Sequence, residues 1–240
     1  MNIFFLSDDP EEAAILQADV HVVKMILEIL QMLCVSIRCS RSVFVFPFEL
    51  YKVTHLNHPC AKWMRYSAKH YEWALKHGIA LCEEYKKRYM KMHKCEPLYR
   101  KLLDLPLPEF AKMSMQDFDE KKISVHQIPR NLQFIPLAMN DQAFSQCACY
   151  LESGVLALSN LDDLSSMVKV VEKDGHQVHV VYSDSNTDST LTKVSLLIDL
   201  KGIDTYRKYY MSKRHTMKRK MYWSGDVESP KKLRGFETLF

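Results

Sequence analysis

Five polar residues recur along an otherwise apolar stretch near the start of the chain, at spacings of four, three, four and three. They are Gln17, His21, Lys24, Glu28 and Gln31. At about 100° per residue, this spacing places them on one narrow face of a helix. An imidazole, an amine and a carboxylate on one face could carry out proton transfer or nucleophilic attack. The same residues could instead form the solvent face of a core helix, with Lys24 and Glu28 as a favourable i,i+4 pair.

Basic and aromatic residues interleave in the last forty residues, where Lys and Arg far outnumber Asp and Glu. Lysine and arginine neutralise nucleic-acid phosphates, and aromatic rings stack on bases. We therefore predict DNA contacts from Lys208, Tyr209, Tyr210, Lys213, Arg214, His215, Lys218 and Arg219. A solvated basic tail is the alternative, and charge alone does not decide between the two.

The segment ADVHVVKMILE resembles the early helix of the pyrimidine-dimer DNA glycosylases of the phage endonuclease V type. That family has Ala-Asp-x-His followed, seven residues after the His, by a Glu. The matching positions in this chain are Ala18, Asp19, His21 and Glu28. The run Lys208-Tyr209-Tyr210, with Lys213 after it, is similar to the Lys-Tyr-Tyr segment near the C-terminus of those enzymes.

Three longer motifs, HVVKMILE, LNHPCAKW and HYEWALKHGIALCEEYKKRYMKMHK, also resemble small phage and large-virus proteins that are usually placed beside this family. The matching segments cover roughly residues 1–94 and 204–223. Residues from about 142 to 203 have no counterpart in the resemblance and are interpreted as an insertion.

The resemblance implies a chemistry in which an amine attacks C1′ of the damaged nucleotide's sugar and forms a Schiff base. Such a reaction needs a neutral amine and a nearby carboxylate that stabilises the positive charge developing on the sugar. Glu28 matches the carboxylate. His21, two helical turns away on the same face, could orient Glu28 or transfer protons near neutral pH.

The nucleophile is where this chain departs from the family, which uses the α-amine exposed when the initiator Met is removed before a small residue. Residue 2 is Asn, a poor context for that removal. The candidates are the amine of Met1, the amine of Asn2 after an unusual removal of Met1, and Lys24. We rank the N-terminal amine first and Lys24 second. A hydrolytic glycosylase that uses water and has no lyase step is a further alternative.

Taken together, the resemblance implies an intracellular DNA glycosylase of the cytoplasm or nucleus. It would excise a damaged or modified base, such as a pyrimidine dimer, with or without AP-lyase activity and with no cofactor. DNA is the expected partner and no membrane is expected. The alternative is an inactive relative that serves as a viral DNA-associated or virion structural protein. Asn2 and the large insertion favour this alternative.

Aromatic residues after the THLNHP turn could form a stacking wall for an extruded nucleotide, or could simply belong to a helix core. The candidates for stacking are Trp63, Tyr71 and Trp73. His55 and His58 in the turn could bind a metal, but no acidic residue stands at ligand spacing, which favours polar loop contacts. Cys147 and Cys149 are too close together for a CxxC motif, so we expect no metal site.

The pattern of apolar residues predicts a helix from Pro10 to about Cys34 and a second from Cys60 to His93, bent near Gly78. Residues 95–140 are expected to be a Pro-rich connection with one short helix. Two β-branched runs flank Asp174-Gly175, a favoured pair for a tight hairpin turn, and TLTKVSLLIDL could add a third strand.

The expected class is therefore α+β, with a mainly helical body and an inserted small antiparallel β element. The expected divisions are a core of residues 1–141, an insertion of 142–203, and a C-terminal helix and tail of 204–240 that completes the core.

Composition narrows the classes of protein further. The seven cysteines are an odd number in a chain long enough to fold without disulfides, which favours a reducing compartment. No apolar run approaches the roughly 20 residues that span a bilayer, and MNIFFLSDDP lacks the basic start of a signal peptide. The sequence holds no P-loop, GxGxxG, GxSxG or HExxH motif.

Overall fold

The structure is a computed structural model of the chain. It describes residues 1–42, 46–113, 123–124, 132, 135–136, 138, 168–173, 176–181, 202–225 and 228–234. The helices are α1 (Pro10–Ile15), α2 (Asp19–Arg38), α3 (Pro59–Tyr66), α4 (Ala68–Tyr89), α5 (Glu96–Leu103), α8 (Gly202–Thr216) and α9 (Lys231–Arg234). The strands are β1 (Ile123–Ser124), β2 (Ile135–Pro136), β3 (Val168–Lys173) and β4 (His176–Val181).

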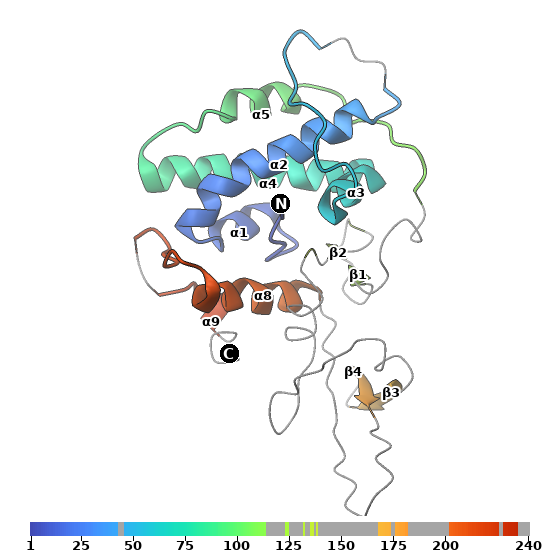
Figure 1. Cartoon of the computed structure of the whole chain (residues 1–240), viewed down its shortest axis with the longest axis vertical. Coiled ribbons are helices and arrows are strands. Elements are labelled where there is room, and N and C mark those ends of the chain that lie inside the picture. Colours follow the sequence, from blue (N-terminus) through green and yellow to red (C-terminus); the bar gives the residue numbers. More distant parts are fainter. Residues whose placement is uncertain are drawn as a thin grey trace, which may run out of the picture.

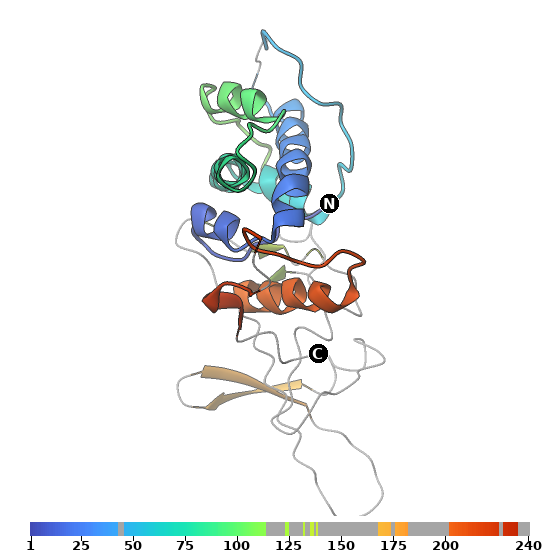
Figure 2. The ribbon, with the colours of Figure 1, turned by 90° about the vertical axis from the view of Figure 1, so that its left-hand side faces the viewer.

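The body is a stack of helices, with α2 and α4 packed against each other in the middle. Helix α5 covers them on one side, and α1 and α8 lie on the other (Figures 1 and 2). The apolar chain start is part of this core, because Ile3, Phe4, Phe5 and Leu6 are all buried. The ring of Phe5 stacks on Trp73 at 4.4 Å between centroids. The first residues are therefore held by the core.

The long first helix expected from the sequence is two helices, because the chain breaks at residues 16–18. The break leaves backbone groups that no helix satisfies, and distant residues supply their partners. The Asp19 N–H donates to the Tyr222 carbonyl at 2.7 Å, and the Trp223 indole N–H donates to the Leu16 carbonyl at 2.9 Å. Gln17, expected on the polar face of the helix, lies in this break and is fully buried.

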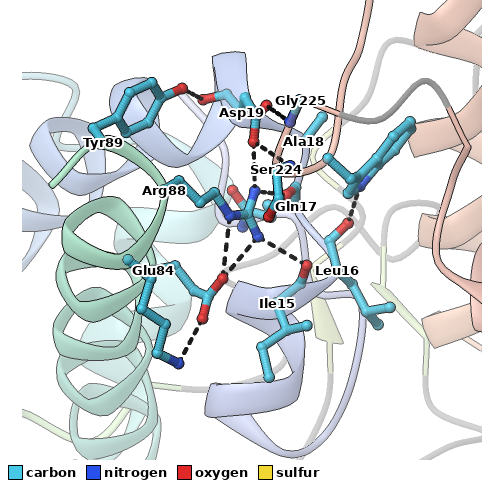
Figure 3. A network of polar contacts seen from close by, with 12 residues as sticks. Ile15, Leu16, Gln17, Ala18, Asp19, Glu84, Arg88, Tyr89, Ser224 and Gly225 are labelled. Carbon is cyan, nitrogen blue, oxygen red and sulfur yellow. Dashed lines mark hydrogen bonds and ion pairs between the residues drawn. The ribbon is translucent and has the colours of Figure 1, made fainter.

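Arg88 of α4 is the centre of the contacts around this break (Figure 3). Its guanidinium donates to the carbonyls of Gln17 at 2.6 Å and Ile15 at 3.0 Å. It also binds the carboxylates of Asp19 at 3.0 Å and Glu84 at 2.9 Å. The Arg88 side chain is only 4% exposed. These contacts, called the Arg88 network below, join α1, α2 and α4.

Asp19 extends the Arg88 network to the C-terminal segment. Its two carboxylate oxygens accept the backbone N–H groups of Ser224 at 2.9 Å and Gly225 at 3.0 Å (Figure 3). Asp19 belongs to the Ala-Asp-x-His pattern that carries the family resemblance. Its contacts here are structural: the side chain fixes the segment after α8 against the start of α2.

The second long helix expected from the sequence also breaks, at Ser67 rather than at Gly78. The Ser67 hydroxyl accepts the His70 N–H and so caps α4, which then continues through Gly78. Gly78 has a packing role instead. A Cβ there would lie 2.2 Å from the Tyr99 ring of α5, so only glycine permits this close approach. The Tyr99 hydroxyl in turn donates to the Ile26 carbonyl.

The expected α+β class is wrong, because the described body is a helical protein whose core is built by helix packing. Strands β1 and β2 pair over two residues each. Strands β3 and β4 pair antiparallel, with Lys173 opposite His176. Neither pair extends beyond two strands within the described residues. The β-branched runs thus indicate that two strands pair locally, but they do not show that a β element belongs to the packed body. The expected third strand in 190–200 lies outside the described residues.

Helix α2 is long and apolar enough to cross a bilayer by length and composition. This corrects the expectation that no segment comes near that length. Two thirds of its most apolar window is buried inside the described body, as is typical of the core helix of a globular fold.

Removing Arg88 should destabilise the protein strongly, because two carboxylates lose their buried cation and two carbonyls lose their hydrogen-bond donor. We expect Arg88→Met to lower the free energy of unfolding by about 3–5 kcal/mol. Lys87→Met is the matched control, since Lys87 pairs with the same Glu84 but its side chain is 69% exposed. Urea denaturation should detect no change for the control. Equal effects of the two variants would contradict the role given to Arg88.

Candidate active site around Glu28

Glu28 lies on α2 with its side chain 13% exposed, facing the start of the chain. Its Oε2 accepts the backbone N–H of Asn2 at 3.1 Å and lies 3.9 Å from the α-amine of Met1. Its Oε1 lies 3.2 Å from Nζ of Lys24. One carboxylate therefore contacts each of the nitrogens that the sequence offers as nucleophile. Met1, Asn2, Lys24 and Glu28 are called the amine site below.

Asn2 fixes the conformation of the chain start. Its Oδ1 accepts the backbone N–H groups of Ile3 at 2.8 Å and Phe4 at 2.9 Å, and its Nδ2 donates to the Ala138 carbonyl at 2.7 Å. Phe4 has a φ of 43°, an unfavourable conformation for a bulky residue. The bond from Phe4 to Asn2 helps to hold it. With Asn2 only 6% exposed, the backbone nitrogen beside Glu28 has a defined position.

Lys24 contacts Glu28 but is not in an environment that favours an uncharged amine. Its side chain is 66% exposed and lies next to a carboxylate. A lysine becomes a neutral nucleophile most readily when burial disfavours its charge. Since the amine of Met1 lies beside the same carboxylate, the ranking of Lys24 below the N-terminal amine stays a prediction.

His21 connects α2 to α8. The Tyr210 hydroxyl accepts the Ala18 N–H at 2.7 Å and lies 2.7 Å from Nδ1 of His21. Because the phenol oxygen already accepts one hydrogen bond, its proton is available to His21. Burial, with smaller effects from the charges of Lys213 and Lys24, lowers the pKa of His21 to about 3. The ring is therefore neutral at pH 7 and serves to hold α8 against the amine-site helix.

The predicted DNA-binding residues divide into buried and exposed groups. Lys208 and Tyr210 are 4% and 0% exposed, so the prediction that they contact DNA is wrong for this conformation. Nζ of Lys213 lies 4.4 Å from the ring centroid of Tyr209 and 5.8 Å from that of Phe4. Lys218 and Arg219, which follow α8, are exposed. Arg214 is half-buried, and the side chain of His215 lies outside the described residues.

The predicted stacking wall is not present, because Trp63, Tyr71 and Trp73 belong to the core. They are 0%, 2% and 6% exposed. Trp63 stacks on His70 at 4.5 Å between centroids, and the Trp73 indole donates to the Asp8 carbonyl. Their faces are covered by other side chains, which leaves none of the three open to a nucleotide.

A hollow of about 510 Å³ opens between α2 and the end of α4. Its lining includes Leu27, Tyr51, Tyr85 and Lys94 but no residue of the amine site. His21, Lys24 and Glu28, which share one helix face, therefore do not line this hollow. His21 is buried, Lys24 is exposed, and only Glu28 lies between these extremes.

The sequence interpretation missed the position of His58. Its ring lies against the chain start, and its pKa is lowered to about 4 by burial, with smaller effects from the positive N-terminus and His55. The only signal in the sequence was the NHPC turn itself. That turn gives no hint of a contact with a residue more than fifty positions earlier.

No protein-family model, curated protein or solved structure matches this chain.

Buried neutral histidines make the stability of the protein depend on pH. His70 and His77 are fully buried, and burial lowers the pKa of each to about 4, as it lowers that of His21 to about 3. Their contribution to stability is complete above the unfolded pKa of about 6.5 and is lost as the pH falls through and below it. Between pH 7 and pH 5 each should cost about 1–2 kcal/mol of unfolding free energy.

Urea denaturation at pH 7, 6 and 5 measures the slope of the unfolding free energy against pH. Most carboxylates stay ionised over this range. The double variant His70→Gln/His77→Gln should reduce this slope by the equivalent of about two protons taken up on unfolding. A wild-type unfolding free energy that is flat over this range would show that these rings do not remain neutral in the folded protein.

Proposed function

We propose that this protein is a DNA base-excision glycosylase with AP-lyase activity that acts on a damaged or modified base. The observation that carries the proposal is the position of Glu28 beside the chain start. A mostly buried carboxylate contacts the backbone nitrogen of Asn2 and lies 3.9 Å from the α-amine of Met1. Amine and carboxylate are the two groups that a Schiff-base glycosylase requires.

In the proposed reaction the unprotonated amine forms a bond to C1′ as the bond from C1′ to the base breaks, and the base leaves with a proton. The sugar ring opens as the C1′–O4′ bond breaks and O4′ takes the second proton of the amine, which gives the Schiff base. Removal of a proton from C2′ then breaks the bond from C3′ to the phosphate oxygen. Glu28 stabilises the positive charge on the sugar in the first step and is the nearest acceptor for the C2′ proton.

Either N-terminal nitrogen could be the nucleophile. The nitrogen of Asn2 is the nearer of the two to Glu28, at 3.1 Å against 3.9 Å for Met1. If Met1 were removed, the nitrogen of Asn2, which already contacts Glu28, would become the α-amine. If Met1 is retained, its own amine faces the same carboxylate.

The charged and aromatic surface of α8 and the residues after it supports DNA as the partner. Lys213 lies over Tyr209, and Lys218 and Arg219 are exposed. We assign the activity to the inside of the cell, in the cytoplasm or nucleus, without a cofactor.

The alternative function is a DNA-associated or virion structural protein that has kept the site but not the chemistry. One observation favours it: the amine and Glu28 form an ion pair, and a protonated amine has no lone pair for attack. In that case Lys24 and the N-terminus are simply the counter-ions of Glu28.

Glu28→Gln should separate the two functions. It keeps the size of the side chain and an acceptor for the Asn2 N–H but removes the charge. Cleavage of a duplex that carries a thymine dimer, or of an abasic-site duplex, should slow by at least about 10²-fold, while DNA binding stays. Glu72→Gln is the matched control, because Glu72 also forms an i,i+4 pair with a lysine, Lys76. If wild type cleaves neither duplex, the structural function is correct.

The salt dependence of duplex binding tests the assignment of the basic surface. Replacing Lys218 and Arg219 by Gln should reduce the slope of log K against log salt by about 1.8, since each phosphate contact contributes about 0.9. The control replaces Lys69 and Lys76 of α4 by Gln and changes the net charge equally. A slope that falls equally in both proteins would indicate a general charge effect instead of specific phosphate contacts.

A further inference from the structure

An exposed apolar surface runs along α2 and the end of α4, outside the amine site. Its side chains are large and hydrophobic, yet they are between 36% and 85% exposed. They are Val23, Leu27, Tyr51, Tyr89, Met90 and Met92, called the apolar band below. Contiguous exposed apolar surface on a folded protein commonly marks a place where a partner binds.

Contacts between the elements show that the apolar band is continuous. Spacings of four residues put its α2 members on the helix face that begins at Asp19. The Tyr89 hydroxyl donates to the Asp19 carbonyl at 3.1 Å, which places the end of α4 beside that face (Figure 3). Leu27, Tyr51 and Met92 line the same hollow of about 510 Å³. One surface therefore joins α2, the end of α4 and the segment before α3.

The hollow gives the apolar band room for the side chains of a partner. Its lining also includes Tyr85, whose ring lies 4.8 Å from that of Tyr89 and 5.0 Å from that of His93 between centroids. An amphipathic helix binds in such a groove by inserting side chains from one of its faces. Methionine adapts its shape to what it contacts, so Met90 and Met92 suit this kind of surface.

The exposed charges beside the apolar band are positive. Lys86, Lys91 and Lys94 are exposed, and none of them forms an ion pair within the part of the chain that the structure describes. The neighbouring carboxylates of α4 and α5 each bind an arginine instead. These pairs are Glu84 with Arg88, and Glu83 and Glu96 with Arg100. The band is therefore flanked by positive charge that favours an acidic partner.

We propose that the apolar band is a docking surface for an acidic amphipathic helix of a partner protein. The apolar face of that helix covers the band and inserts into the hollow, while its carboxylates lie against Lys86, Lys91 and Lys94. A second copy of this chain fits less well, because its own band carries the same positive charges. The inference does not depend on the proposed function, since no residue of the band belongs to the amine site or to α8.

Three synthetic peptides of roughly 18 residues, long enough for a helix to form on binding, test the chemistry of the occupant. The first has Leu and Phe on one helical face and Glu at the other positions. The second has the same composition with the apolar residues scattered, and the third has Lys in place of every Glu. Fluorescence anisotropy should show that wild type binds the first at least about tenfold more tightly than the others.

Exchanging apolar side chains tests whether the peptide binds at the band. The double variant Leu27→Gln/Met92→Gln should weaken binding of the first peptide at least about tenfold, because it removes two apolar contacts at the hollow. The matched control is Leu103→Gln/Leu107→Gln, since these leucines are 49% and 45% exposed but lie outside the band. The control should bind as wild type does. Equal weakening in both proteins would contradict the proposed location.

Exchanging lysines tests the charge of the partner. The double variant Lys91→Gln/Lys94→Gln should weaken binding of the first peptide, and the difference from wild type should shrink as salt is added. The double variant Lys69→Gln/Lys76→Gln changes the net charge equally at exposed positions of α4 outside the band and should have no such effect. Equal effects of the two variants would show that only net charge matters.

A measurement on wild type does not depend on the folding of any variant. Hydrogen peroxide converts exposed methionine thioethers to sulfoxides, which mass spectrometry locates. The first peptide should slow oxidation of Met90 and Met92 but not of Met217, which follows α8.

Three results would overturn the proposal. Wild type may bind none of the peptides, or bind the scattered or Lys peptide as tightly as the first. Binding to vesicles of anionic lipid without binding to the first peptide would assign the band to a membrane surface. A dimer that Leu27→Gln/Met92→Gln abolishes in sedimentation would assign it to a second copy of this chain.

Discussion

The Arg88 network is the interaction on which the positions of the other elements depend. Its guanidinium binds the carbonyls of Ile15 and Gln17, at the point where α1 ends and before α2 begins. This determines where α2 starts and therefore which of its residues face the chain start. Through Asp19 the same network holds Ser224 and Gly225, and so anchors the segment that follows α8. A single buried side chain thus joins the N-terminal helices to the C-terminal segment.

Within this frame the chain start and α8 both contact α2. Tyr210 of α8 binds Ala18 and His21, while the chain start reaches Glu28 two turns further along the same helix. Each of these contacts is between residues far apart in the sequence. The site therefore forms only when α2, α8 and the first residues have packed together.

The sequence was informative where the determinants are local. The i,i+4 relation of Lys24 and Glu28 follows from helical periodicity, and the ion pair is present. The Pro at the start of α3 and the short helix α5 also follow from local signals. The break at residues 16–18 could not be predicted, because its carbonyls are satisfied by Arg88, about seventy residues later.

Other errors have the same origin in tertiary contacts. In the sequence, Trp63 and Trp73 fit either a stacking wall or a helix core. Only their burial in the folded chain decides between these two roles. The β-branched runs around residues 168–181 indicate a local pair but do not reveal whether a sheet takes part in the core. His58 could be recognised as a cap, but its burial near the positive chain start depends on how α3 packs.

The most direct test of the central claim is to locate the covalent bond to DNA. The protein would be trapped on an abasic-site duplex with borohydride and cleaved before Asp residues, which separates residues 1–7 from the peptide that begins at Asp19 and contains Lys24. The account predicts that the adduct lies on residues 1–7, with the mass showing whether Met1 is retained. An adduct on Lys24, or no adduct with any duplex, would contradict it.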